Sequence, residues 1–91
     1  MTDKKIAVIG LGYVGLPLAR LFATKYPVVG FDINKRRVEE LRQGKDTTLE
    51  VENEVLQSVL LSSNPVNTDS TKKGLYCTDE LEDIKDCNYY V

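Results

Sequence analysis

The sequence predicts an α/β fold built on a parallel, doubly wound sheet. Short apolar runs alternate with segments whose apolar residues recur every three or four positions, which is the pattern of strands alternating with helices. A glycine-rich turn separates the first apolar run from the first helical segment, and an acidic residue closes the second apolar run. The length of 91 residues leaves room for one domain at most, with a modest core.

The first predicted strand is the continuous apolar run Ile6–Ile9, which is typical of a parallel strand buried on both faces. A helix is expected from Gly15 to about Tyr26, with Pro17 in its first turn, where the missing N–H costs nothing. Apolar residues at helical spacing are expected to face the sheet from this helix: Leu18, Leu21 and Phe22.

The second predicted strand is Pro27–Asp32, with the proline at its start, where a missing donor is tolerated. Asn34 is the expected N-cap of a charged helix that runs to about Arg42 and stops at Gly44. The predicted inward residues of this helix are Val38 and Leu41.

The rest of the chain continues the alternation. The predicted order is a polar loop at 45–48, a helix over Glu50–Leu61, an exposed connection over Ser62–Gly74, a strand over Leu75–Thr78, a short helix over Asp79–Lys85 with Leu81 and Ile84 inward, and a strand over Asn88–Val91. Because the sequence stops inside that strand, residues 1–91 are interpreted as an incomplete, amino-terminal part of a domain.

Composition and charge exclude several classes of protein. The formal charge is −2, and Lys and Arg are interspersed with Asp and Glu, so a nucleic-acid partner is not expected. No apolar run approaches the roughly 20 residues of a membrane-spanning helix, so no membrane segment is expected and a cytoplasmic location is predicted.

Residues that commonly perform catalysis or bind metals are scarce. Cys77 and Cys87 are the only cysteines and histidine is absent, so no metal site is predicted. The thiols are expected to be buried or idle rather than joined in a disulfide, because nothing else suggests secretion. Without histidine the chain lacks the commonest general acid or base, so no catalytic residue is assigned and the chemistry is expected elsewhere.

The glycine-rich turn Gly10-Leu11-Gly12-Tyr13-Val14-Gly15 has the G-x-G-x-x-G pattern of Rossmann-type dinucleotide-binding folds. In that pattern the first glycine permits a tight turn, the second lets the backbone approach a diphosphate, and the third lets the helix pack closely on the strand. A glycine turn without a ligand is the alternative. The position between a strand and a helix favours the binding interpretation.

Asp32 strengthens this interpretation because it follows Gly12 by 20 residues, at the end of the second predicted strand. An acidic side chain there accepts hydrogen bonds from ribose hydroxyls, and its charge opposes the 2′-phosphate of NADP, so NAD is the predicted cofactor. The alternative for Asp32 is a solvated or helix-capping carboxylate. Arg36 and Arg37 are the residues that would accommodate a phosphate instead.

Longer stretches of the sequence are also distinctive: Gly10–Pro17 (GLGYVGLP), the strand before it, and Gly30–Leu41 (GFDINKRRVEEL). These segments resemble the UDP-glucose/GDP-mannose dehydrogenase family, and the resemblance covers nearly the whole chain. Within the family, Gly44–Val51 (GKDTTLEV) is similar to the branch that oxidises UDP-N-acetylhexosamines, either UDP-N-acetylgalactosamine or UDP-N-acetylglucosamine, for surface polysaccharides.

This resemblance implies oxidation of a sugar C6 alcohol to a carboxylate while two NAD molecules are reduced in turn, in a parent protein expected to be a homo-oligomer. The family's catalytic and sugar-binding residues have no counterparts here, and neither cysteine falls in its nucleophile motif. The implied cofactor-binding residues are Gly10, Leu11, Gly12, Tyr13, Val14, Gly15, Asp32 and Arg37. For Arg37, a surface arginine on the second helix is the alternative.

Two other functions share the glycine turn and the acidic residue. One is another NAD-dependent dehydrogenase, such as an enzyme acting on 3-hydroxy acids, and the other is a nucleotide-sensing regulatory module. The G-Y-V-G-L-P run argues against the first, and the incomplete sheet argues against the second. On the dehydrogenase interpretation, residues 1–91 alone are expected to be inactive and to bind NAD weakly, because half of the dinucleotide site is absent.

Overall fold

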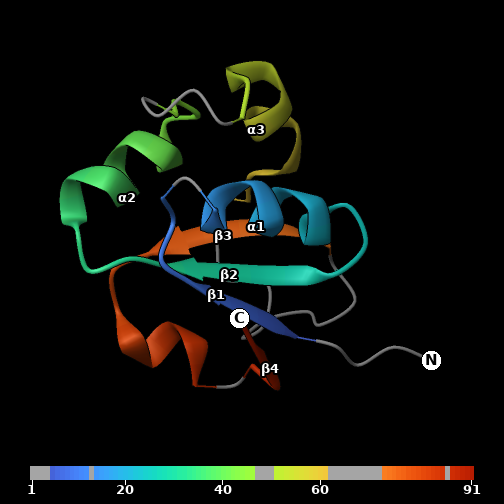
Figure 1. The fold of residues 1–91 in the computed structure, drawn as a ribbon, viewed down its shortest axis with the longest axis vertical. Coiled ribbons are helices and arrows are strands. Elements are labelled where there is room, and N and C mark those ends of the chain that lie inside the picture. The colour runs from blue at the N-terminus through green and yellow to red at the C-terminus, as the bar shows by residue number, and fades with distance from the viewer. Residues whose placement is uncertain (1–4, 13, 47–50, 62–72, 86) are drawn as a thin grey trace.

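The computed structural model describes residues 5–12, 14–46, 51–61, 73–85 and 87–91 (Figure 1). Its elements, in chain order, are β1 (Ile6–Ile9), α1 (Gly15–Ala23), β2 (Pro27–Phe31), α2 (Lys35–Arg42), α3 (Asn53–Val59), β3 (Gly74–Thr78), the 3-10 helix η1 (Leu81–Ile84) and β4 (Tyr89–Tyr90). The predicted alternation of strands and helices is therefore confirmed.

The strands form one parallel sheet in the order β3-β2-β1-β4. Helices α1, α2 and α3 cover one face, and η1 lies on the opposite face (Figure 1). The chain crosses from one face to the other between β3 and β4, so the strand order reverses at the boundary between β1 and β4. This is the predicted doubly wound topology, with its switch point next to β1.

Alternating residues of the central strands fill two separate cores. Val8 and Val28 face α1–α3, whereas Ala7 and Val29 face η1. Ile9 is 51% exposed, so β1 is buried on both faces only up to its last residue, and the prediction of complete burial is wrong there.

Helix α1 packs on the sheet through a different face from the predicted one. Leu16, Ala19 and Ala23 are buried, while Leu21 is 55% exposed, so the prediction that Leu21 faces the core is wrong. Leu18 and Phe22 are only partly buried. The small alanines let the helix backbone approach the strands closely, so Leu16 is the one large side chain of α1 that is fully buried.

Helix α2 begins and ends as predicted. The Asn34 side chain accepts hydrogen bonds from the backbone N–H groups of Arg36 (3.0 Å) and Arg37 (3.2 Å), which confirms it as the N-cap. Gly44 terminates the helical turn with a positive φ of 78°. Val38 and Leu41 are buried, also as predicted.

Helix α3 is shorter than the predicted Glu50–Leu61. It ends at Val59 because Leu60 turns to an extended conformation and the next N–H, of Leu61, donates to the Leu75 carbonyl (2.8 Å). The chain thus joins the edge of β3 instead of continuing the helix. Most of the predicted connection Ser62–Gly74 and part of the loop at 45–48 lie outside the described residues.

The predicted helix Asp79–Lys85 is a 3-10 turn, η1. The Thr78 hydroxyl donates to the Asp83 carboxylate (2.6 Å) and accepts from the Glu80 N–H (3.1 Å), which tightens the chain directly after β3. Ile84 is buried as predicted, but Leu81 is 65% exposed, so its predicted inward position is wrong. A tight 3-10 turn presents fewer residues to the sheet than an α-helix would.

The two cysteines are buried and are not joined in a disulfide, as the sequence predicts. They lie in the cores on opposite faces of the sheet. Cys77 belongs to the core beneath α1–α3, and Cys87 belongs to the core beneath η1. Burial raises the pKa of the Cys77 thiol to about 12, although Arg42 and Arg37 lower it in part. Among the described residues, no helix is long and apolar enough to cross a membrane.

We expect Gly15→Ala to destabilise the chain by on the order of 3 kcal/mol, because the added methyl would overlap the Gly10 carbonyl oxygen, a backbone atom that cannot move aside. The matched control is Gly12→Ala, where no atom lies within 4 Å of the added carbon. Urea unfolding of both variants is the measurement. Equal stabilities would show that α1 does not pack this closely on β1.

We expect ionisation of Cys77 to destabilise the fold at high pH. The folded-state pKa of about 12 lies above the ordinary 9.0, so this stabilisation is complete below pH 9 and is lost progressively as the pH rises toward 12. The unfolding free energy of the wild-type chain should therefore decrease across this window relative to that of Cys77→Ala. If the difference between the unfolding free energies of the wild type and Cys77→Ala stayed constant from pH 9 to 12, the thiol would not be buried.

Candidate functional site

A surface hollow lies at the topological switch point, where the carboxyl ends of β1 and β4 meet. In doubly wound sheets, ligands bind in the crevice outside the carboxyl ends of the strands at this point. The hollow is lined by the end of β1, the glycine loop, the first turns of α1 and the residue after β4: Val8, Ile9, Gly10, Gly12, Val14, Gly15, Leu18 and Val91. The switch point of the sheet and the glycine loop predicted from the sequence thus lie at the same hollow.

The glycine loop leaves β1 through a left-handed turn. Gly10 has a φ of 94°, which favours glycine, and its N–H donates to the Phe31 carbonyl at the end of β2 (2.7 Å). At Gly12 the space around the Cα is open, with no atom within 4 Å of the position that a Cβ would take. The loop is therefore anchored at Gly10 and accessible at Gly12.

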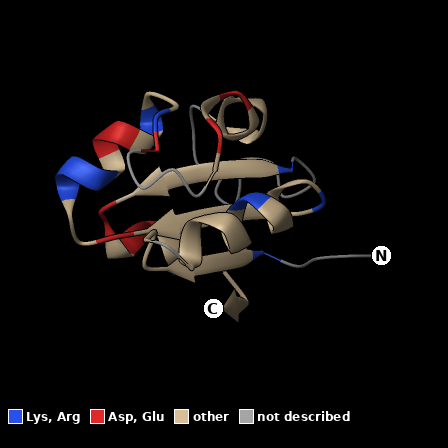
Figure 2. Ribbon diagram, turned by 45° about the horizontal axis from the view of Figure 1, so that its top comes forward, with Lys and Arg blue, Asp and Glu red and all other residues tan. Residues whose placement is uncertain are grey.

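Helix α1 begins next to this open side. Its N-cap, Val14, makes no side-chain hydrogen bond to the helix, and its first turn contains no acidic residue. Arg20 is the one charged residue of α1, and Figure 2 shows no Asp or Glu colour along this helix. The amino end of α1 therefore has the partial positive charge that suits an anion.

Leu11 connects the glycine loop to β2. Its side chain is fully buried, and the absence of a side chain at Gly30 makes room for it, since a Cβ there would lie 2.8 Å from Leu11 Cδ2. Its N–H donates to Asp32 Oδ2 (2.9 Å). The loop is thus tied to the residue directly after β2.

Asp32 lies beside the glycine loop, as the sequence predicts. Its carboxylate accepts from the N–H groups of Leu11 and Asn34 (both 2.9 Å), one on each oxygen, and its own N–H donates to the Thr78 carbonyl (3.0 Å). Each carboxylate oxygen has two lone pairs, so both oxygens can accept a further hydrogen bond. Asp32 is partly exposed, which leaves it accessible to hydroxyl groups of a ligand.

Arg37 is buried, so the alternative of a surface arginine is wrong. It is 8% exposed, its Nε–H donates to the Leu11 carbonyl (2.7 Å), and Nη1 donates to Asp46 Oδ1 (2.8 Å). Asp46 is 3% exposed, although the sequence placed it in a polar loop. Sequence analysis missed its role, because no motif marks an aspartate nine residues after an arginine as its partner.

Of the two variable residues between the second and third glycines of the motif, only Val14 is among the described residues. Val14 is 73% exposed at the start of α1, so its side chain does not contribute to the core. Tyr13 lies outside the described residues. Beside Asp32, Ile33 is 84% exposed and places a large apolar side chain next to the site.

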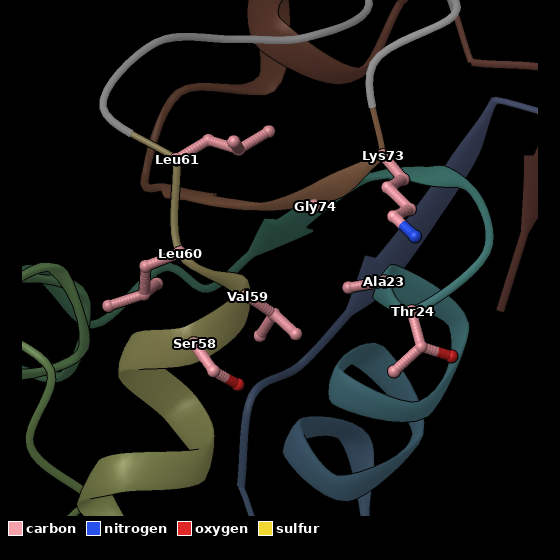
Figure 3. A pocket seen from close by; sticks show the side chains of 8 residues that line it. All are labelled: Ala23, Thr24, Ser58, Val59, Leu60, Leu61, Lys73 and Gly74. Atoms are coloured by element: carbon pink, nitrogen blue, oxygen red, sulfur yellow. The ribbon is translucent and has the colours of Figure 1, made fainter.

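A second hollow lies at the opposite, amino ends of the strands (Figure 3). It is lined by the end of α1, the end of α3 and the start of β3, including Ala23, Thr24, Ser58, Leu61, Lys73 and Gly74. The hydroxyls of Thr24 and Ser58 donate to carbonyls of their own helices, Leu21 (2.7 Å) and Val55 (2.6 Å). The lining therefore presents no activated nucleophile, and this hollow is separate from the glycine loop.

Cys77 is buried in the core and does not line the hollow at the switch point. The raised pKa of Cys77 keeps its thiol protonated at neutral pH. No group of three or more His, Cys, Asp or Glu that could hold a metal gathers among the described residues.

Comparisons with known proteins agree with this geometry. Residues 4–79 match the model of the UDP-glucose/GDP-mannose dehydrogenase family, NAD binding domain. The chain is 46% identical to UDP-N-acetyl-D-glucosamine 6-dehydrogenases of Salmonella typhi (over 98% of the chain) and Pseudomonas aeruginosa (over 100%). It spans 18% of the length of each of these relatives.

Solved structures share the fold. UDP-D-ManNAc dehydrogenase from Pyrococcus horikoshii superposes with a TM-score of 0.73 at 35% identity, over 94% of this chain and 19% of that one. The family model and the identity over the whole chain lead to one conclusion: the chain belongs to the UDP-glucose/GDP-mannose dehydrogenase family and corresponds to its NAD-binding domain.

Proposed function

We propose that the Gly10–Gly15 loop and Asp32 hold NAD for a dehydrogenase that oxidises the C6 alcohol of a UDP-N-acetylhexosamine to the uronate. UDP-N-acetylglucosamine and UDP-N-acetylgalactosamine are the proposed substrates. The names of the relatives at 46% identity support this substrate class, as does the segment Gly44–Val51. Membership of the family disfavours an enzyme acting on 3-hydroxy acids.

The observation that carries the proposal is the hydrogen bond from the Leu11 N–H to Asp32 Oδ2 (2.9 Å), which joins the two halves of the sequence motif in one site. On one side of this bond, Gly12 leaves its backbone open beside the amino end of α1, where a diphosphate fits. On the other side, the Asp32 oxygens are placed to accept bonds from adenosine ribose hydroxyls.

The residues present fit NAD better than NADP. The Asp32 charge disfavours a 2′-phosphate, and the Arg37 guanidinium is directed inward to Leu11 and Asp46. Arg36 remains exposed on α2. Bound NAD supplies a hydride acceptor, while this chain's own residues bind and orient it. Contacts through the backbone N–H groups of Tyr13 and Val14 complete the proposed cofactor site, and Leu11 contributes by holding the loop in place.

The whole protein is proposed to act in the cytoplasm as a homo-oligomer, and to serve the synthesis of surface polysaccharides. The supporting observations are the family assignment and the nucleotide-sugar substrates in the relatives' names. The catalytic groups are proposed to lie in the part of such a protein that residues 1–91 do not include, since the chain spans 18% of these relatives.

We expect Asp32→Asn to reduce the preference for NAD over NADP by roughly tenfold, because it removes the charge that opposes the 2′-phosphate but keeps an acceptor for the Leu11 N–H. Calorimetric titration with each cofactor is the measurement. Glu39→Gln, which removes an exposed charge on α2, is the matched control and should leave the ratio unchanged. An unchanged ratio for Asp32→Asn would show that this carboxylate does not face the ribose.

We expect the 91-residue chain to bind NAD weakly and to produce no NADH from UDP-N-acetylglucosamine or UDP-N-acetylgalactosamine. The chain contains no histidine, and its described thiols are buried. Absorbance at the NADH band would be followed in the presence of each sugar nucleotide. Steady NADH formation that requires the sugar nucleotide would contradict the proposal that catalytic groups lie outside these residues.

A further inference from the structure

The chain contains a buried ion pair that connects α2 to the segment before α3. The Arg37 and Asp46 side chains are 9% and 0% exposed, and Nη1 lies 2.8 Å from Oδ1. The exposed pair Lys85–Glu82 is very different, because its side chains are 62% and 81% exposed. Burying two charges carries a desolvation cost, and stability alone is a weak reason for keeping such a pair.

Asp46 is held firmly on its own side of the pair. Its second oxygen, Oδ2, accepts from the Val51 N–H (2.9 Å), and its backbone N–H donates to the side chain of Asn53 (3.1 Å), the first residue of α3. With both carboxylate oxygens bonded, Asp46 fixes the position and the plane of the Arg37 guanidinium.

Arg37 in turn holds the glycine loop. Its Nε–H donates to the Leu11 carbonyl (2.7 Å). This carbonyl belongs to the peptide unit that also contains the Gly12 N–H. The chain has no cis peptide bonds among its described residues, and in a trans peptide the C=O and the N–H point in opposite directions. Because Arg37 draws the Leu11 carbonyl inward, the Gly12 N–H is directed away from Arg37.

We propose that Asp46 is a positioning residue for the cofactor loop: through Arg37 it fixes the Leu11–Gly12 peptide so that the Gly12 N–H faces the diphosphate. This inference rests on the proposed NAD site. The buried pair sets the orientation of one donor, while the hydrogen bond from Leu11 N–H to Asp32 sets the neighbouring peptide. Asp46 itself, with a side chain that is 0% exposed, does not touch the ligand.

The sharpest test replaces the pair by apolar residues of similar size, Arg37→Met/Asp46→Leu, because such replacements commonly preserve folding. In the cofactor-free chain, the Leu11 and Gly12 amide resonances should shift in the two-dimensional ¹⁵N spectrum. NAD affinity should fall by on the order of tenfold, the factor expected when a hydrogen bond to a charged group is lost. NADP affinity should fall by the same factor, because both cofactors share the diphosphate.

Two single variants complete the design. Asp46→Asn keeps the shape but removes the charge, and it should reproduce the amide shifts with Arg37 still present. Glu82→Gln breaks the exposed ion pair and should change neither the amide shifts nor the affinity. If Arg37 acted only as a direct cofactor ligand, Asp46→Asn would leave the Gly12 amide where it is in the wild type, and this would overturn the proposal.

The amide spectra and the titrations separate this inference from the function on which it rests. A folded double variant with wild-type Gly12 resonance or wild-type NAD affinity overturns the positioning role. If the double variant does not fold, the comparison of Asp46→Asn with the wild type decides by the same readouts. If the wild-type chain binds neither cofactor, the proposed function fails at this chain length, and the amide shifts alone support or overturn the positioning of the peptide.

Discussion

The arrangement of the site depends on the immobilisation of one residue, Leu11. Its side chain is fully buried against Gly30, its N–H is bonded to Asp32, and its carbonyl is bonded to Arg37. These contacts come from β2, from the residue after β2 and from α2. A loop fixed on three sides presents its next peptide in one orientation, so a ligand would not have to order it on binding.

Close approach between α1 and β1 is the second constraint, and small residues make it possible. At Gly15 a Cβ would overlap the Gly10 carbonyl oxygen, and Ala19 and Ala23 are buried in the contact with the sheet. The amino end of α1 consequently lies beside the carboxyl end of β1. Helix α2 uses Asn34 to satisfy its own first N–H groups, whereas α1 has no such side-chain cap. The partial positive charge at the amino end of α1 therefore lies at the site, without a side chain that caps it.

Charge is distributed around the loop in a way that suits a dinucleotide with a free ribose hydroxyl. Asp32 places a negative charge at the end of β2, and Arg37 is neutralised by Asp46 within the fold. The strongly buried Cys77 remains a protonated thiol beneath α2. Binding, orientation and selection of the cofactor are the roles that we propose for these residues.

Sequence by itself determined the class of fold, the location of the glycine loop, the caps of α2 and the position of Asp32 at the end of β2, because turn geometry and strand periodicity leave local signals. Tertiary structure decided which face of α1 is buried, where α3 ends, and that Arg37 turns inward to Asp46. Those outcomes depend on contacts between segments that are distant in sequence or on the depth at which a side chain is buried. A periodic pattern in the sequence carries no information about distant contacts or about the depth of burial. Only the packing of the helices against the sheet decides both.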